Sequence, residues 1–238
     1  MENINLAMKK SYQANINEIQ ELDKEAKRLG MGGNQTPDNS ERKYKERMQK
    51  RKNIQSERIN LRNGKKGLVI VFTGNGKGKT TAALGMALRT LGHDQKAVIV
   101  QFIKGSWATG EEKAFKIFGE NISWHSLGEG FTWETQDRIR DEKLVREAWD
   151  LAISYFEDKT YKLIILDEIN IALKLGYLSP NEIISSIKKY KSENSHIVLT
   201  GRGAPQSIID FADLVSEMKV VKHPFKEQGI KAQECIEY

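Results

Sequence analysis

The sequence has no long apolar run and holds one cysteine, Cys235. Its longest apolar stretches, such as residues 67–72 and 163–166, fall far short of the roughly 20 residues that a membrane-spanning helix needs. The first residues contain no apolar segment of the kind that a secretory signal carries. A single cysteine excludes a disulfide within the chain and a cysteine-rich metal site. These absences predict a protein of the reducing cytoplasm without a membrane partner.

Valine, phenylalanine and tryptophan are absent from residues 1–66, so this segment cannot form a core of its own. Residues 4–29 predict an amphipathic helix, residues 30–39 a break, and Ser40 the cap of a very polar helix that runs to Arg62. We therefore expect an extra helical segment without an assigned role over 1–39, a polar arm over 40–66 and one larger domain over 67–238. The first helix carries its apolar residues in one stripe: Ile4, Met8, Tyr12, Ile16, Ile19, Leu22, Ala26 and Leu29.

The positive charge of the chain also lies at this end. The net charge is +6, but residues 1–66 hold 16 Lys and Arg against 9 Asp and Glu, whereas residues 67–238 hold 22 against 23. A nucleic-acid partner would therefore have to bind the N-terminal segment. A solvated helical surface explains the same charge more simply, so nucleic acid is not expected as a partner.

From Gly67 onward, short apolar runs alternate with helical patterns. This alternation predicts an α/β fold of the P-loop (RecA-like) kind, a mostly parallel sheet with helices on both faces, preceded by the N-terminal helical extension. Ser179, Pro180 and Glu182 predict a capped helix start. Strands are expected at 68–72, 97–102, 122–126, 163–166, 196–200, 214–221 and 231–236, and helices at 79–91, 111–118, 134–157, from 179 and at 205–211.

A glycine-rich loop joins the first of these strands to the first helix. The residues from Val71 read VFTGNGKGKTTAAL. Glycines let backbone N–H groups turn toward an anion, and the following helix start adds partial positive charge. Lys79 is placed to reach the terminal phosphates and Thr80 to bind Mg²⁺. The general pattern G-x-x-x-x-G-K-[ST] would need glycine where Thr73 stands, so this loop is a variant that is one residue shorter and carries an extra lysine, Lys77.

Asp167 and Glu168 end a buried strand, LIILDE, which is expected to lie beside the phosphate loop. A carboxylate there can hold Mg²⁺, so the predicted metal residues are Thr80, Asp167 and Glu168. The sequence suggests no Ser-His-Asp set, and its four histidines stand at scattered positions. If the protein is an enzyme, its substrate is expected to bring its own nucleophile.

These motifs together resemble the P-loop type of ATP:corrinoid adenosyltransferase. The short loop that departs from the general pattern is the loop of that family. The helix that follows Ser40 also resembles the N-terminal arm of the family, whereas residues 1–35 lie outside the resemblance. The matching segments are GNGKGKTT at 74–81, VQFIKG at 100–105, GFTWETQ at 130–136, LDE at 166–168, TGRG at 200–203, ADLVSEMKVVKHPF at 212–225 and GIKAQECIEY at 229–238.

The resemblance implies that the 5′-deoxyadenosyl group of ATP is transferred to Co(I) of a corrinoid, with release of triphosphate, in the synthesis or salvage of adenosylcobalamin. ATP and the corrinoid would be substrates, and Mg²⁺ or Mn²⁺ the metal. Lys79, Thr80 and Glu168 would be catalytic. The nucleotide would be held by the loop residues Gly74, Asn75, Gly76, Lys77, Gly78, Lys79, Thr80 and Thr81.

For the corrinoid, the resemblance implies contacts from Phe131 and Trp133 with the lower face of the ring. Arg202, in the loop after a strand end, is a candidate for contact with either phosphate or corrinoid, and Lys104 is a further candidate. It also implies a homodimer, whose arm lies over an active site, and a flavoprotein reductase as electron donor. Two alternatives compete with this interpretation: a nucleoside-kinase-like P-loop enzyme, which would release ADP, and a nucleic-acid-stimulated ATPase, which would use the basic N-terminal segment.

Overall fold

The computed structural model describes residues 17–18, 20–25, 27–28, 41–62, 64–103, 109–127 and 137–237. The chain divides into two compact units, Met1–Lys65 and Lys66–Tyr238. Within the described ranges, none of the helices combines the length and the apolar content that a membrane crossing requires.

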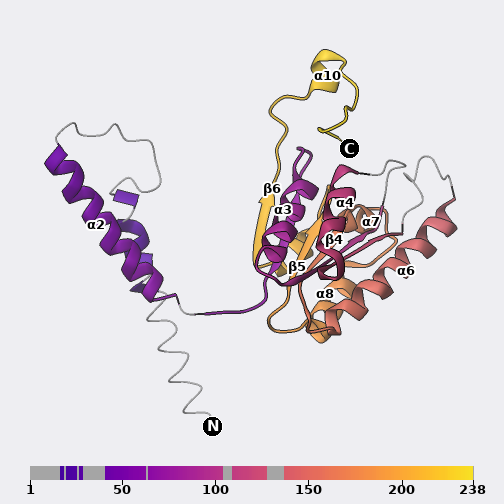
Figure 1. Ribbon diagram of the computed structural model, residues 1–238, viewed down its shortest axis with the longest axis horizontal. Coiled ribbons are helices and arrows are strands. Elements are labelled where there is room, and N and C mark those ends of the chain that lie inside the picture. Colours follow the sequence, from indigo (N-terminus) through magenta and orange to yellow (C-terminus); the bar gives the residue numbers. More distant parts are fainter. Residues whose placement is uncertain are drawn as a thin grey trace, which may run out of the picture. The chain divides into compact units, whose positions relative to one another are not determined.

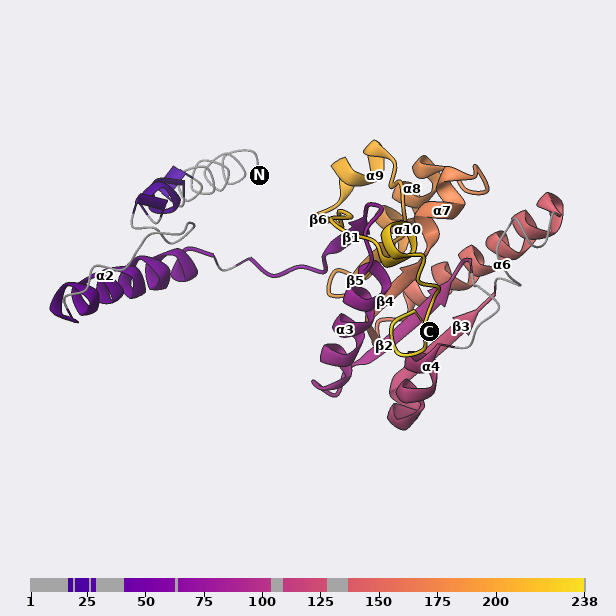
Figure 2. The same ribbon diagram turned by 90° about the horizontal axis from the view of Figure 1, so that it is seen from above.

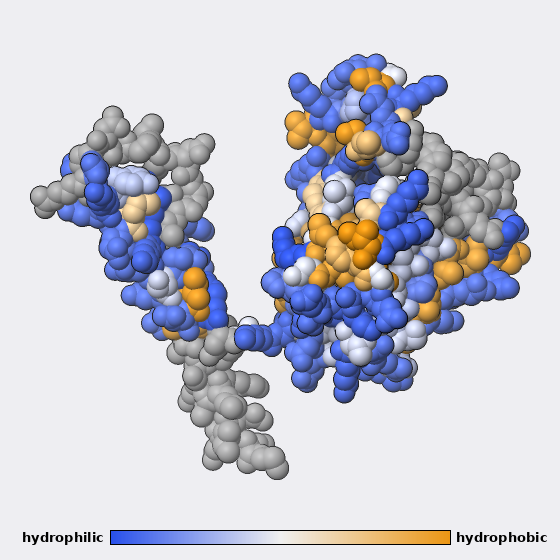
Figure 3. Space-filling view, in the orientation of Figure 1, coloured by the Kyte–Doolittle hydropathy of each residue, from blue (hydrophilic) through white to orange (hydrophobic). Residues whose placement is uncertain are grey.

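The first unit contains α2 (Glu41–Asn60) and the described part of the helix predicted over 4–29, which is helical at 17–18, 20–25 and 27–28. Ion pairs join the two: Asp23 pairs with Arg58, and Glu25 lies 3.0 Å from Lys50. The visible surface of α2 is hydrophilic over most of its length (Figure 3). Charged side chains therefore take part in the contact between this helix and its neighbour, and Ile54 of α2 is buried.

The second unit is built on a six-stranded sheet in the order β3-β2-β4-β5-β1-β6, with every described pairing parallel. Helices cover both faces (Figures 1 and 2), so the four central strands are buried and read as largely apolar runs, whereas the two edge strands are half-buried or exposed. The strands are β1 (Val69–Thr73), β2 (Lys96–Gln101), β3 (Ile122–Ser126), β4 (Tyr161–Asp167), β5 (His196–Thr200) and β6 (Leu214–Glu217).

Alternate residues of the four central strands build two cores. Val71, Val98 and Ile164 belong to a core that includes side chains of α6, α7, α8 and α9, whereas Ile70, Ile99 and Ile165 pack with α3 and Phe115 of α4 on the other face. The sheet is therefore the middle layer of three, as the strand–helix alternation predicts. The helices are α3 (Lys79–Leu91), α4 (Gly110–Phe115) with a 3₁₀ turn η1 (Lys116–Asn121), α6 (Arg138–Glu157), α7 (Ile169–Lys174), α8 (Pro180–Tyr190), α9 (Gln206–Phe211) and α10 (Pro224–Gln228).

Besides shifts of a few residues at the ends of elements, three predictions of local structure were wrong or incomplete. Residues 231–236 form no strand: residues 231–233 are irregular and residues 234–237 form a turn, because Ile236 and Glu237 donate their N–H groups locally to the carbonyl of Gln233. The strand predicted over 214–221 ends at Glu217, since the chain then turns toward the phosphate loop. Ser179 stands at the N-cap of α8 but its side chain makes no capping hydrogen bond.

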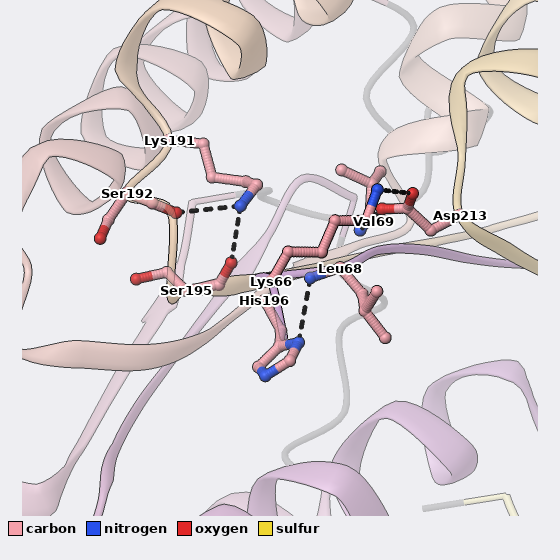
Figure 4. A network of polar contacts seen from close by, with 8 residues as sticks. All are labelled: Lys66, Leu68, Val69, Lys191, Ser192, Ser195, His196 and Asp213. Atoms are coloured by element: carbon pink, nitrogen blue, oxygen red, sulfur yellow. Dashed lines mark hydrogen bonds and ion pairs between the residues drawn. The ribbon is translucent and has the colours of Figure 1, made fainter. Parts of the chain in front are cut away.

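Polar contacts gather at the amino ends of the central strands (Figure 4). Asp213 accepts a hydrogen bond from the Val69 N–H at 2.9 Å and pairs with Lys66. Lys191 donates to two backbone carbonyls, at 2.9 and 3.0 Å. We call this set the amino-end network; its members are Lys66, Leu68, Val69, Lys191, Ser192, Ser195, His196 and Asp213.

Candidate active site

The predicted phosphate loop lies between β1 and α3, at the carboxyl ends of the strands. Gly74 and Gly78 have φ values of 95° and 111°, which favour glycine because a Cβ clashes in that region. The N–H of Gly76 donates to the carbonyl of Met218 at 2.6 Å. A Cβ on Gly76 would lie 2.8 Å from that same oxygen, so the chain after β6 leaves no room for a side chain there.

Lys79 is buried at the first position of α3, with 6% of its surface exposed. Its ammonium donates to the carbonyl of Gly76 at 2.7 Å. Burial lowers the pKa of Lys79, while the charge of Glu168 opposes that shift. A buried ammonium with one backbone partner has donors left over, so it can bind an anion at the loop.

The Asp167 carboxylate collects hydrogen bonds from three strands or helices. Oδ1 accepts from Thr80 at 2.9 Å and from Thr200 at 2.7 Å, and Oδ2 accepts from Gln101 at 3.2 Å. Burial raises the pKa of Asp167, and these hydrogen bonds oppose the shift. The sequence predicted that Asp167 lies beside Thr80, and in the structure the two side chains are in direct contact.

Glu168 is the N-cap residue of α7 and has a φ of 61°, an uncommon value for a residue with a side chain. Its N–H donates to Thr200 at 2.9 Å, which ties this conformation to the end of β5. Burial and the neighbouring Asp167 raise the pKa of Glu168 to about 7, and Lys79 and Arg202 act in the opposite direction. The Glu168 carboxylate and the Lys79 ammonium therefore lie close enough for each charge to shift the pKa of the other group.

The other predicted residues either are exposed or lie outside the described residues. Asn75, Lys77 and Thr81 are exposed, and Lys77 forms an ion pair with Glu237 at 2.7 Å. Arg202 is exposed on the loop after β5, and its charge lowers the pKa of Lys79. Phe131, Trp133 and Lys104 lie outside the described residues. Among those described, no group of three or more His, Cys, Asp and Glu side chains could hold a metal ion by itself.

Two buried polar residues beside the site were missed by the sequence reasoning. Gln101, at the end of β2, bonds Asp167 directly. Asn170 is fully buried on α7 and donates to the carbonyl of Gly201 at 3.2 Å, while its Oδ1 has no partner. A polar residue at the carboxyl end of an otherwise apolar strand was the signal that could have identified Gln101.

A glycine loop between a parallel strand and a helix that opens with Lys-Thr, beside a buried strand-end carboxylate, defines a nucleotide-binding protein of the P-loop class. The solved structure of the flagellar accessory protein FlaH from Methanocaldococcus jannaschii superimposes with a TM-score of 0.44 and 13% identity, over 64% of this chain and 71% of that one. A similarity this low says nothing about activity.

Sequence comparisons are far more specific. A family model described as "ATP:corrinoid adenosyltransferase BtuR/CobO/CobP" matches residues 65–238, and one described as "Cob(I)alamin adenosyltransferase N terminal" matches residues 34–59. The chain therefore belongs to the ATP:corrinoid adenosyltransferase family, and it is an enzyme of that type.

Individual relatives match over nearly their whole length. The corrinoid adenosyltransferase of Pseudomonas aeruginosa is 46% identical over 205 residues, which cover 86% of this chain and 100% of that protein. The corrinoid adenosyltransferase of Escherichia coli (strain K12) is 38% identical over 199 residues, covering 84% and 100%. Corrinoid adenosyltransferase CobA of Salmonella typhimurium is 39% identical with the same coverage.

Proposed function

We propose that this enzyme transfers the 5′-deoxyadenosyl group of ATP to Co(I) of a corrinoid and releases triphosphate. The observation that carries the proposal is a phosphate loop of the short form, residues 74–81, between β1 and α3, with Lys79 buried behind it and Thr80 bonded to Asp167. This is the phosphate end of an ATP site, in a chain of the adenosyltransferase family.

In this reaction the corrinoid supplies the nucleophile. The Co(I) electron pair attacks C5′ of the ribose, a Co–C bond forms, the C5′–O bond breaks, and its electron pair leaves with triphosphate. The protein positions the two substrates and stabilises the charge on the leaving group. Lys79 would exchange its bond to the Gly76 carbonyl for one to the triphosphate, and the loop N–H groups would donate to the same oxygens.

Mg²⁺ or Mn²⁺ is the metal that fits the donors of this site. The Thr80 hydroxyl and the carboxylates of Asp167 and Glu168 are oxygen ligands of the kind that hard divalent cations prefer. Thr80 and Asp167 already lie in contact, at 2.9 Å. When bound, the ion would neutralise part of the triphosphate charge. Thr80 and Glu168 would hold it, with Asp167 orienting the Thr80 hydroxyl.

For the corrinoid, we propose contacts from Phe131 and Trp133, which would displace the lower axial ligand and ease reduction of the cobalt. Arg202 would contact either substrate, since its charge already acts on Lys79 and Glu168. A flavoprotein reductase would deliver the electron, and the enzyme would work in the cytoplasm. Replacing Phe131 and Trp133 together by alanine should slow formation of Co(I) from Co(II) while leaving transfer from chemically made Co(I) less affected; equal losses in both assays would contradict the assignment.

For the arm, we propose that residues 40–66 cover an active site in a homodimer, that of the partner copy. The match of residues 34–59 to the N-terminal family model supports this role. Deleting residues 1–62 should spare ATP binding and lower corrinoid turnover, because the second unit keeps both of its cores. Turnover equal to that of the full chain would rule out the covering role.

The decisive test of the activity is an anaerobic absorption spectrum. The protein is mixed with MgATP and chemically reduced Co(I) corrinoid, and triphosphate is assayed in the same sample. The Co(I) absorption should convert to that of a light-sensitive adenosyl product, with an equal amount of triphosphate. An unchanged Co(I) signal with accumulating ADP and phosphate would show ordinary phosphoryl transfer instead.

A further inference from the structure

A row of polar side chains crosses the carboxyl ends of four strands. Ser126 of β3 and Asp167 of β4 are both register partners of Gln101 on the strand between them. Side chains at matching positions of neighbouring strands project from the same face of a sheet. Thr200 of β5 continues the row and donates to Asp167 at 2.7 Å. The row therefore leads from the edge strand β3 to the strand that carries the site carboxylates.

The partners of Gln101 fix the orientation of its amide. Oε1 accepts from the Trp124 indole at 3.1 Å and from the Ser126 hydroxyl at 2.7 Å. An indole N–H can only donate, so the amide atom beside it must be the oxygen. The amide nitrogen then faces Asp167 Oδ2, at 3.2 Å, where a carboxylate can only accept. Both ends of the amide are thus matched, and a flipped amide would mismatch both.

Asp167 depends on such a donor because only 3% of its surface is exposed. A buried carboxylate that loses a hydrogen bond has no water to replace it. Oδ1 faces Thr80 and Thr200, so Gln101 is the side-chain donor that the structure gives to Oδ2 among the described residues. With both oxygens held, the carboxylate cannot rotate away from the Thr80 hydroxyl.

We propose that Gln101, held by Trp124 and Ser126, is a positioning residue that fixes the Asp167 carboxylate and through it the metal-binding hydroxyl of Thr80. The identity of the ligand, a metal complex of ATP, rests on the proposed function. Gln101 does not touch substrate; it acts through Asp167. We call Trp124, Ser126, Gln101, Asp167 and Thr80 the relay. It connects the carboxyl ends of β2 and β3 to the phosphate loop. In the chain, these two strands precede residues 104–108 and 128–136.

The test measures ATP affinity of the full-length protein by calorimetry, with Mg²⁺ and with a chelator, and takes the ratio. Gln101→Met keeps the side-chain volume and removes both polar ends, and Gln101→Glu places an acceptor against the Asp167 carboxylate. Because a lost bond to a charged group is worth roughly one order of magnitude or more, Gln101→Met should lower the Mg²⁺-dependent gain in affinity about tenfold. Gln101→Glu should lower it further, and affinity in chelator should change less than about twofold.

Ser123→Ala is the matched control. Ser123 lies on the same strand as Trp124 and Ser126 but bonds the Tyr161 hydroxyl at 2.8 Å, away from the relay. Its Mg²⁺-dependent gain should equal that of the wild type. If the substitutions merely loosened the β3 edge, all variants would lose thermal stability, and the Mg²⁺-dependent gain in ATP affinity would not be selectively reduced in the Gln101 variants.

An unchanged gain in Gln101→Met would overturn the proposal, and so would the absence of any Mg²⁺-dependent gain in the wild type. Should the Gln101 variants not fold, Trp124→Phe and Ser126→Ala leave Gln101 in place and each remove one donor to it. Each should reduce the gain about two- to fivefold, and wild-type values in both would equally refute the relay. Failure of adenosyl transfer by the wild type, with the affinity ratios as expected, would instead reject the proposed function alone.

Discussion

The two ends of the sheet carry polar networks of opposite character. At the amino ends, Asp213 and Lys191 use their charges to satisfy backbone groups of neighbouring segments (Figure 4). At the carboxyl ends, Lys79 and Glu168 are shielded from water and have few partners. Burial lowers the pKa of Lys79 and raises the pKa of Glu168, which favours the neutral form of each. The amino-end groups bond backbone atoms and stabilise the fold, whereas Lys79 and Glu168 keep donors and acceptors that a ligand can use.

Two lysines, one at each end of the sheet, give the sharpest test of this comparison, because burial lowers the pKa of both Lys79 and Lys191. Lys79→Met should reduce adenosyl transfer about a thousandfold, since it removes charge stabilisation of the leaving triphosphate, and should leave stability unchanged or higher. Lys191→Met should destabilise the fold by about 1–3 kcal/mol, because two carbonyls lose their donor, and leave the activity of folded molecules intact.

Steady-state rates and urea unfolding of the two variants are the measurements. Equal losses of activity in both, or a destabilised Lys79→Met, would erase the distinction between the two ends of the sheet.

The raised pKa of Glu168 predicts that the stability of the folded protein depends on pH. Its folded pKa of about 7 lies above the ordinary 4.5, so the folded state holds this proton more tightly than the unfolded chain does. Stability from this group is present below pH 4.5 and is lost as pH rises through 7. In ligand-free protein, Glu168→Gln should therefore gain stability over the wild type as pH rises, by about 2–3 kcal/mol above pH 7. Urea unfolding at several pH values checks this, and a constant difference would contradict it.

Much of this arrangement could be predicted from the sequence. The buried strands are visible as apolar runs, and β3, β5 and α3 occupy the predicted residues without change. The loop and the Asp167–Glu168 pair follow from residue types at a strand–helix junction. Contacts made between distant segments could not be predicted, since no local pattern records them: Gly76 bonded to Met218, and Gln101 aimed at Asp167.

Failures of the local predictions have the same origin. Glu182 was expected to complete a capping box with Ser179, yet its carboxylate pairs with Arg146 of α6 at 2.6 Å. The short α7 begins at Ile169 directly after the left-handed Glu168, a backbone conformation that propensity does not foresee. In both cases a residue of a distant segment makes the bond: Arg146 pairs with Glu182, and Thr200 accepts from the N–H of Glu168.

At the amino end, Asp213 should matter for stability alone. Asp213→Ala leaves the Val69 N–H without its acceptor and Lys66 without its partner. We expect a loss of about 1–2 kcal/mol in the free energy of unfolding, as for other buried donors left unpaired, with unchanged ATP affinity. Asp210→Ala is the control, because Asp210 accepts a hydrogen bond at 2.7 Å from Gln206, an exposed neighbour on α9. Thermal unfolding with and without ATP reads out both, and weakened ATP binding in Asp213→Ala would argue against the division.

The smallest effect is expected at the ion pair of Lys77 and Glu237, at the carboxyl end. Both side chains are partly exposed, at 53% and 36%, so the pair contributes little to stability. It does occupy a loop lysine that triphosphate would also bind. Glu237→Gln should leave stability within about 0.5 kcal/mol and tighten triphosphate binding at most a few-fold, which calorimetry with inorganic triphosphate can measure. Weaker binding would show that Glu237 helps to hold the ligand.

The strand order has a consequence for how the protein folds. Among the described strands, β1 is the first in the chain, yet its neighbours are β5 and β6, the last two, with Val69 opposite Ile197 and Ile70 opposite Leu214. A nascent chain must therefore keep β1 unpaired until the remaining strands have been synthesised, and pairings this distant in sequence form slowly. The phosphate loop follows β1 and bonds Met218, beyond β6. The ability to bind a nucleotide should thus be among the last properties that the folding chain acquires.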